Sequence, residues 1–421
     1  MIYDRLYQKY DFPKIIKELL TCPGLLRLQE IGQANVPFIN FPSFRATRYE
    51  HSLGVCHLAS LTSDILNLNK KDKTELMIAC LYHDVATPPF SHAVEEILQL
   101  NFNFDHDKYL YDLLVGKSDD IGREKTQIYL GKSIKLHSVC QKKEAKNIGI
   151  DIKEIADLTM GKGLLGSLIK RDIDLDNIDN VIRAASSMGI IEANGLLAEQ
   201  LAKSFVINDD VLCLSEEKLK YFERWQNIRF NLYNLIYTDL DDFSIQTMIK
   251  HALNLLLERG EITKNDWNLT EDQLIYKKFY LYPESKYIID RIKLHNYYSC
   301  LLQFSITGKN ARNKIYSNIS KFETIANEMF KTDTIANYFI DKRVRSLPMP
   351  IILLKEKRQL KKEENEDHII FGIFAKIYKK ITDNEKHNFI DNIKKSLIPD
   401  LKINRIYTTF EKYPQLKLGE W

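Results

Sequence analysis

Two nearby stretches decide the fold of this chain: RYEHSLGVCHLAS, residues 48–60, and LYHDVATPPFSH, residues 81–92. Between them, the segment LMIACLY (residues 76–82) is apolar on all sides and therefore predicts a buried helix. That helix must end close before the Pro-Pro pair of the second stretch, because proline cannot donate an interior helical hydrogen bond. Ser91, just after the pair, is placed to cap the helix that follows.

Histidines and carboxylates occupy the ends of these predicted helices. His51 lies on the first helix, and His83 and Asp84 lie where the buried helix ends. Imidazole and carboxylate ligands that converge from separate rigid elements suit manganese, magnesium, iron or zinc, so this pattern predicts a divalent metal site. A further ligand is expected from the acidic stretch RDIDLDNIDNVIRAA, where spacing leaves four carboxylates open: Asp172, Asp174, Asp176 and Asp179.

The composition indicates a globular, cytoplasmic protein. Of 421 residues, 44% are hydrophobic, and no apolar run approaches the length of about 20 residues that a membrane span requires. The net charge of +3 is a small difference between 60 basic and 57 acidic side chains, so charge alone favours neither a nucleic-acid coat nor a membrane surface. The six cysteines form no CxxC pair, which favours reduced thiols over structural zinc.

The predicted fold class is mainly α, a helical bundle with a smaller C-terminal α+β subdomain. Helical patterns continue to about residue 330, and we place a boundary near residue 335, between a body of residues 1–335 and a tail of residues 336–421. The metal site is expected within residues 30–240. In the tail we expect strands in 347–354, 368–378 and 401–410, a charged loop in 355–367 and a helix in 388–397.

Several segments, in order, resemble motifs of the HD-domain phosphohydrolases, and among them of the SAM-and-HD-domain and dGTPase-like dNTP triphosphohydrolases. The resemblance covers most of residues 10–240. It is carried by CPGLLRLQEIGQ (22–33), RYEHSLGV (48–55), HDVATPPFSH (83–92), IDLDNIDNVIRAASSMGI (173–190) and IRFNLYNLIY (228–237).

The resemblance implies a role for each matching residue. The metal ligands would be His51, His83, Asp84 and Asp176, which leaves Asp174 and Asp179 as capping or surface residues. The residues near the reacting phosphate that would carry protons are His92, Glu95, His106 and Asp107. The substrate would contact Arg48 and Arg229 through its phosphates, and Gln33, Asn180 and Tyr237 elsewhere.

The departures from the family pattern lie at the substrate end of the site. Thr87 replaces a histidine, Asn180 replaces a tyrosine that packs on the sugar, and Ala184 replaces an aspartate that reads the 3′-hydroxyl. Thr21 stands where some relatives carry an aspartate that reads a guanine activator, and this departure counts against that kind of activation, while a nucleotide activator stays an open alternative.

The leading expectation is a metal-dependent nucleotide phosphohydrolase that converts a dNTP and water into a deoxynucleoside and triphosphate. One alternative keeps the chemistry but changes the substrate to another nucleotide, a signalling nucleotide or a nucleic-acid end. Another is a nucleotide-binding regulatory module without turnover. A homo-oligomer is expected in each case, since relatives assemble, and a membrane partner is not expected.

Overall fold

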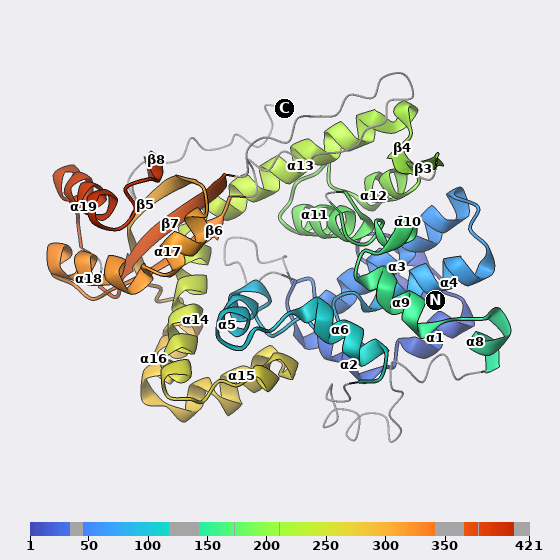
Figure 1. Cartoon of the computed structure of the whole chain (residues 1–421), viewed down its shortest axis with the longest axis horizontal. Helices are drawn as coiled ribbons and strands as arrows, with labels where there is room; N and C mark the ends of the chain where they lie inside the picture. Colours follow the sequence, from blue (N-terminus) through green and yellow to red (C-terminus); the bar gives the residue numbers. More distant parts are fainter. Residues whose placement is uncertain are drawn as a thin grey trace. The chain divides into compact units, whose positions relative to one another are not determined.

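The structure is a computed structural model, and it describes residues 1–33, 45–117, 143–171, 173–209, 211–341, 366–377 and 379–407 (Figure 1). Helices dominate this described part, as the sequence predicts. The chain divides into two compact units. Described residues of the first unit come from Met1–Leu232 and Leu256–Tyr280, and those of the second come from Tyr233–Leu255, Leu281–Ser346 and Lys361–Trp421.

The first unit is a helical body with two small hairpins. Its strands are β1 (Ile2–Asp4) with β2 (Gln8–Tyr10), and β3 (Phe205–Asn208) with β4 (Val211–Leu214). Its helices are α1 (Lys14–Leu19), α2 (Pro23–Arg27), α3 (Arg48–Ile65), α4 (Lys70–Tyr82), α5 (His92–Phe102), α6 (His106–Leu114), α8 (Lys143–Ile148), α9 (Ile152–Thr159), α10 (Gly163–Gly166), α11 (Leu175–Ser187), α12 (Gly195–Ala202) and α15 (Glu271–Lys277). Two further helices, α13 (Leu219–Thr238) and α14 (Leu240–Glu258), each have residues in both units.

Helices α3 and α4 form where the two deciding stretches predict them. Thr47 caps α3 in a capping box with Glu50, whose backbone N–H lies 3.2 Å from the threonine hydroxyl. Every residue of α4 from Thr74 to Tyr82 is buried, and the helix ends at Tyr82 with His83 in the C-cap position. The prediction that a buried helix ends at the HD pair is therefore confirmed.

Ser91 does not cap α5 through its side chain, so that expectation was wrong. Phe90 and Ser91 have positive φ angles of 53° and 47° in the tight turn after the prolines. This turn directs the Ser91 hydroxyl inward, where it accepts a hydrogen bond from Arg48 Nε at 3.2 Å and donates to the Gly32 carbonyl at 3.4 Å.

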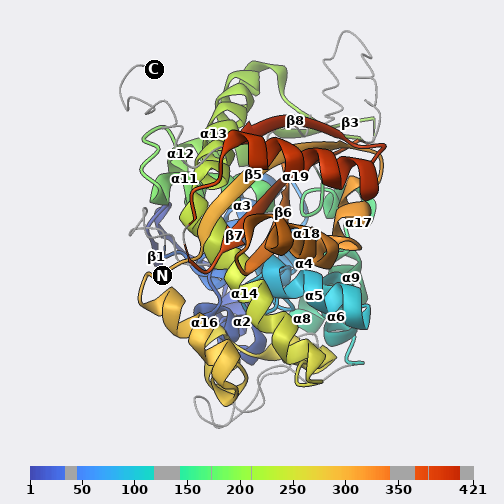
Figure 2. The ribbon, with the colours of Figure 1, turned by 90° about the vertical axis from the view of Figure 1, so that its left-hand side faces the viewer.

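The second unit contains α16 (Pro283–Lys293), β5 (Ser299–Gly308), α17 (Ala311–Tyr316), α18 (Ile319–Phe330), β6 (Thr334–Ile340), β7 (Asp367–Ala375), α19 (Asp383–Ser396) and β8 (Lys402–Tyr407). Its strands form a four-stranded antiparallel sheet in the order β6-β7-β5-β8. Alternate residues of β7 face opposite sides. Phe371 belongs to the core shared with helices α17, α18 and α19, which line one face (Figure 2), whereas Phe374 contacts Phe243 of α14 at 5.0 Å between ring centroids.

Strand β5 corrects the expectation that helix continues to about residue 330. Eight of its ten residues are buried, so its sequence SCLLQFSITG lacks the alternation that marks a strand with one exposed face. Position 335, where we place the boundary from sequence, lies inside β6. The expected strands in 368–378 and 401–410 and the helix in 388–397 are confirmed, whereas 347–354 and most of 355–367 lie outside the described residues.

The cysteines and the hydropathy of the helices were the two features for which composition gave an expectation. The five cysteines in the described part are free and buried, as expected for reduced thiols: Cys22, Cys56, Cys80, Cys213 and Cys300. Among the helices that the structure describes, none is long and apolar enough to cross a membrane.

Candidate metal centre

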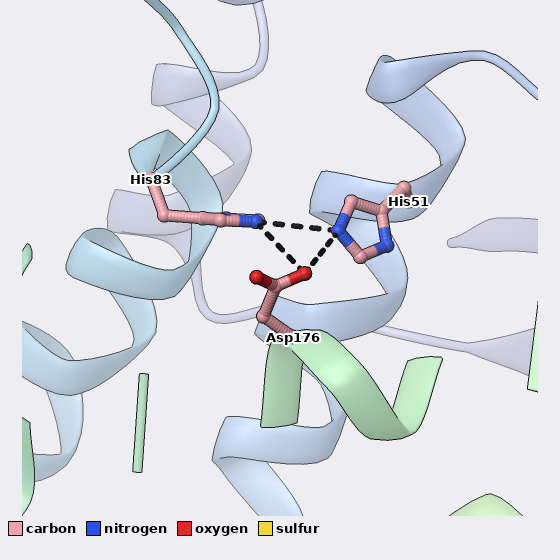
Figure 3. Close-up of side chains that lie close together, drawn as sticks. All are labelled: His51, His83 and Asp176. Atoms are coloured by element: carbon pink, nitrogen blue, oxygen red, sulfur yellow. Dashed lines mark hydrogen bonds and ion pairs between the residues drawn. The ribbon is translucent and has the colours of Figure 1, made fainter. Parts of the chain in front are cut away.

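Three helices bring two imidazoles and a carboxylate together in the first unit (Figure 3). His51 comes from α3, His83 from the end of α4 and Asp176 from the first turn of α11. The Nε2 atoms of the two histidines lie 3.2 Å apart, and Asp176 Oδ1 lies 2.9 Å from His51 Nε2 and 3.6 Å from His83 Nε2. The structure thus assembles three of the four predicted ligands around one point.

Asp84 adds a fourth oxygen to this group. Its Oδ2 lies 3.8 Å from His51 Nε2 and 3.6 Å from His83 Nε2. The carboxylate is held on both oxygens, because Arg48 Nη1 donates to Oδ2 at 2.7 Å and the Thr87 hydroxyl donates to Oδ1 at 3.1 Å. Thr87, which stands where the family pattern has histidine, therefore orients the Asp84 carboxylate.

The Nδ1 atoms of both histidines are hydrogen-bonded to acceptors other than the facing ligand atoms. His83 Nδ1 donates to the Cys80 carbonyl at 2.7 Å, and His51 Nδ1 donates to Asp179 Oδ1 at 2.7 Å. Because each Nδ1 carries a proton, each neutral ring presents the lone pair of Nε2 toward the other ring. Two lone pairs that face each other beside two carboxylates form an electron-rich pocket that suits a cation.

The spacing of these atoms fits a divalent metal. With metal–ligand bonds of about 2.1 Å, neighbouring ligand atoms lie roughly 3.0 Å apart in octahedral and 3.4 Å apart in tetrahedral coordination. The five contacts among these ligand atoms span 2.9 to 3.8 Å. A mixed nitrogen and oxygen donor set of this kind suits Mn²⁺, Fe²⁺, Mg²⁺ or Zn²⁺.

The electrostatics of the pocket favour positive charge. Burial alone would lower the pKa of His51, but its hydrogen bonds to Asp176 and Asp179 raise that pKa to about 9. Burial alone would raise the pKa of Asp84, but Arg48, His83 and His51 hold it well below its usual value. The carboxylates are therefore ionised at neutral pH, and the pocket holds protons when no cation replaces them.

Asp179 is buried beside His51, so the expectation that it caps or lies on the surface was wrong. Its Oδ1 accepts from His51 Nδ1, and its side chain is fully enclosed. Arg183, four residues later on α11, donates to both carboxylate oxygens at 2.8 and 2.9 Å. By contrast, Asp174 caps α11 by accepting from Asn177 N at 2.7 Å, as expected, and Asp172 lies outside the described residues.

The residues proposed to carry protons form a separate linked group on α5 and α6. Glu95 accepts from His92 at 3.1 Å and contacts His106, and His106 Nε2 lies 3.2 Å from Asp107 Oδ1. Burial opposes charge on His106, but its bonds to Asp107 and Glu95 raise its pKa to about 10. His106 is therefore cationic at neutral pH, and Lys170 pairs with Asp107 on the far side.

Of the residues predicted to contact the substrate, two meet in the structure, and the other two considered next lie on α13. Gln33 and Asn180 meet, since Gln33 Nε2 donates to Asn180 Oδ1 at 3.0 Å. The side-chain oxygen of Gln33, Oε1, is buried without a hydrogen-bond partner among the described residues. Arg229 is buried on α13. Tyr237 also lies on α13, but its side chain is outside the described part of the chain.

Arg27 and Glu271 support the site, and no role was predicted for either, although Arg27 lies within the matching segment of residues 22–33. Buried Arg27 donates to the carbonyls of Val85 at 3.0 Å and Leu269 at 2.8 Å, and so ties the loop after the HD pair to the segment before α15. Glu271 on α15 accepts from Gly32 N at 2.9 Å, next to Gln33. A sequence offers little signal for such contacts, because 239 positions separate Glu271 from Gly32.

We expect Glu271 to make stability depend on pH. Burial raises the pKa of Glu271 to about 7, against the opposing effect of backbone hydrogen bonds from Gly32 and Phe90. The folded carboxyl therefore keeps its proton at pH values where the unfolded one has lost it, so the free energy of unfolding falls as pH rises from about 4.3 to 7. Glu271→Gln should flatten this slope in urea denaturation measured at pH 5 and pH 8. Equal slopes in both proteins would contradict this expectation.

The fold and the site together define a mainly helical domain with a cluster of histidine and aspartate side chains that could hold a metal ion. Residues 48–183 match the model of the HD domain. This range includes α3, α4 and α11, which carry the four clustered side chains.

Known proteins resemble the chain beyond this domain. An uncharacterized protein of Methanocaldococcus jannaschii is 23% identical over 336 residues, which is 78% of this chain and 65% of that protein. A deoxynucleoside triphosphate triphosphohydrolase SAMHD1 homolog of Dictyostelium discoideum is 25% identical over 366 residues, 80% of this chain and 66% of that protein. The match thus spans slightly less than two thirds of the length of these relatives.

A solved structure shares the fold. The crystal structure of a hypothetical protein from Aquifex aeolicus superposes with a TM-score of 0.61 and 18% identity, covering 89% of this chain and 96% of that one. This likeness concerns the arrangement of the backbone.

Proposed function

We propose that the chain is a metal-dependent nucleotide phosphohydrolase, and that its substrate is a dNTP cleaved to a deoxynucleoside and triphosphate. The observation that carries this proposal is the pair of Nε2 atoms of His51 and His83, which lie 3.2 Å apart beside Asp84 and Asp176. The HD domain and the likeness to a dNTP triphosphohydrolase homolog support the same chemistry.

These four side chains would hold the cation. A divalent cation bound there supplies a water of lowered pKa and polarises a phosphoryl oxygen. The chain keeps both imidazoles oriented for this purpose, since Cys80 O and Asp179 bind their Nδ1 protons. Arg48 would lie beside the phosphates, where its buried guanidinium offsets their charge, and Arg229 is proposed for a second phosphate contact.

Proton transfer is proposed for the group on α5 and α6. His106 holds a proton at neutral pH because Asp107 and Glu95 stabilise its charge. His92 is largely exposed, with 63% of its side chain accessible, and it shares Glu95 with His106. Either imidazole could donate a proton to the leaving group while Glu95 keeps it oriented, which is the arrangement that general acid catalysis needs.

A second candidate substrate follows from the rebuilt sugar pocket. Asn180 and Ala184 replace the tyrosine and aspartate of the family pattern, and Asn180 is bonded to Gln33. This favours another nucleotide, a signalling nucleotide or a nucleic-acid end as the alternative within the same chemistry. We further expect a homo-oligomer, which sedimentation of the purified chain would test.

The test is a substrate panel read by product identity. Purified chain would be incubated with each dNTP, ribonucleotides, cyclic dinucleotides and single-stranded DNA, with Mn²⁺ or Mg²⁺. Triphosphate and deoxynucleoside in a one-to-one ratio support the dNTP proposal. Release of 5′-mononucleotides from DNA, or turnover of another nucleotide alone, supports the second candidate, and turnover of none contradicts a hydrolase.

We expect Gln33 to read a hydroxyl of the substrate sugar. Its buried amide oxygen lacks a partner among the described residues, so it can accept from a 3′-hydroxyl. Gln33→Ala should lower kcat/KM for the substrate by about 10- to 100-fold, the usual effect of one lost buried hydrogen bond. It should also remove the preference of the wild type for a dNTP over the matching 2′,3′-dideoxy compound. A preference that persists in the variant would exclude this role.

A further inference from the structure

A network of buried, hydrogen-bonded side chains leads from His51 to the N-terminal hairpin, which we define as residues Met1–Tyr10. Asp179 Oδ1 accepts from His51 Nδ1 at 2.7 Å and from Arg183 Nε at 2.8 Å. Asp179 Oδ2 accepts from Arg183 Nη2 at 2.9 Å and from the Tyr7 hydroxyl at 2.7 Å. Both carboxylate oxygens thus have two donors each.

The N-terminal hairpin supplies the members of this network that are most distant from His51. Asp4 pairs with Arg183, with Nη2 and Oδ2 3.2 Å apart, and both side chains are at most 4% exposed. Asp4 Oδ1 also accepts from the backbone of Leu6 and Tyr7 at 2.6 and 3.0 Å, so the turn of the hairpin holds the carboxylate in place. The ring of Tyr7 lies 5.1 Å from that of His57 on α3.

The buried carboxylate of Asp179 depends on its hydrogen-bond donors and on a counter-charge. Asp179 is fully buried, and a carboxylate in such a place is unfavourable unless it is paired and hydrogen-bonded. Arg183 supplies the counter-charge, and Asp4 keeps Arg183 in position. A histidine that ligates a metal is best oriented when a carboxylate binds its other nitrogen, because this selects the tautomer and raises the basicity of the ligand.

We propose that Asp179 is a positioning residue of the metal centre, which keeps Nε2 of His51 free for the cation, and that Asp4 and Tyr7 make the N-terminal hairpin part of that centre. This inference rests on the proposed metal function. It assigns a role in metal affinity to Asp4 and Tyr7, which lie more than 40 positions before His51 and outside the segment that matches the HD domain.

The test measures metal binding by the full chain without substrate. Mn²⁺ would be titrated into the wild type, Asp179→Asn, Tyr7→Phe and Asp242→Asn, with free Mn²⁺ followed by electron paramagnetic resonance. Asp179→Asn should weaken binding by about 10- to 100-fold. Tyr7→Phe removes one hydrogen bond to Asp179 and should weaken it by about two- to tenfold. Asp242→Asn is the control and should bind Mn²⁺ like the wild type, because it replaces another buried carboxylate that accepts a side-chain hydrogen bond, from Gln246, on a helix that carries none of the four clustered side chains.

A second readout separates positioning from general stability. Co²⁺ bound to the folded protein gives a visible absorption spectrum that reports the ligands, and we expect Asp179→Asn to change its bands. A purely structural role would lower the melting temperature and leave affinity and spectrum unchanged in the folded protein.

The outcomes are distinct. Wild-type affinity and spectrum in both Asp179→Asn and Tyr7→Phe would overturn this inference and leave the proposed function standing. Should Asp179→Asn fail to fold, Tyr7→Phe decides alone, since it removes a single oxygen atom. A wild type that binds neither Mn²⁺ nor Co²⁺ would overturn the proposed function, and this inference with it.

Discussion

Replacing His83 by alanine should abolish metal binding and reduce hydrolysis by a factor on the order of 10³ or more. The imidazole contributes one of the two facing nitrogens, 3.2 Å from its partner on His51, and its removal leaves too few donors to hold a divalent cation. Since the cation is proposed to supply several kcal/mol of transition-state stabilisation, its loss accounts for an effect of this size. Bound manganese, measured by mass spectrometry, and product release should fall together.

The control for this variant is His387→Ala, which removes an exposed histidine from α19 in the second unit. Circular dichroism should show an unchanged fold in both proteins. Stoichiometric metal and a wild-type rate in His83→Ala would exclude this histidine as a ligand.

Replacing Gly54 by alanine should disrupt the site from inside the core. A Cβ at this position would lie 2.1 Å from Asp179 Oδ2 and 2.4 Å from Arg183 Nη2, so one of them must move. Both are buried and paired, and overpacking a core costs about 1 to 3 kcal/mol, while breaking a buried ion pair costs about 3 to 5 kcal/mol. We expect a loss of several kcal/mol of unfolding free energy, and a melting temperature lower by on the order of 10 °C.

Ser60→Ala tests whether this effect is specific to the position. It introduces the same residue on the same helix α3, where Ser60 is partly exposed, and it should leave stability nearly unchanged. An unchanged melting temperature in Gly54→Ala would mean that the Asp179 and Arg183 pair can move away at little cost.

Local patterns were sufficient to predict much of the fold. The all-round apolar segment before His83 and the following prolines placed the HD pair at the end of a buried helix, because burial and helix termination are properties of neighbouring residues. Strand β5 escaped prediction for a related reason, since a continuous apolar run is compatible with both a buried strand and a buried helix.

The environment of Asp179 could not be predicted in the same way. Asp174, Asp176 and Asp179 look equivalent in an acidic run, but their roles differ. Asp174 caps a helix, Asp176 lies beside Nε2 of His51, and Asp179 accepts a hydrogen bond from Nδ1 of His51. The glycine three residues after His51 was an available signal, since it leaves room on that face of α3 for an approaching side chain.

The types of the metal-binding side chains, and the helices that carry them, follow from the order of residues along the chain. The convergence of those side chains does not, because His51 and Asp176 are 125 positions apart and meet through the packing of α3 against α11. The same holds for Tyr7 and Asp179, 172 positions apart, and for Glu271 and Gly32. Spacing specifies which groups can share a helix face, whereas burial and charge pairing depend on which distant segments pack together.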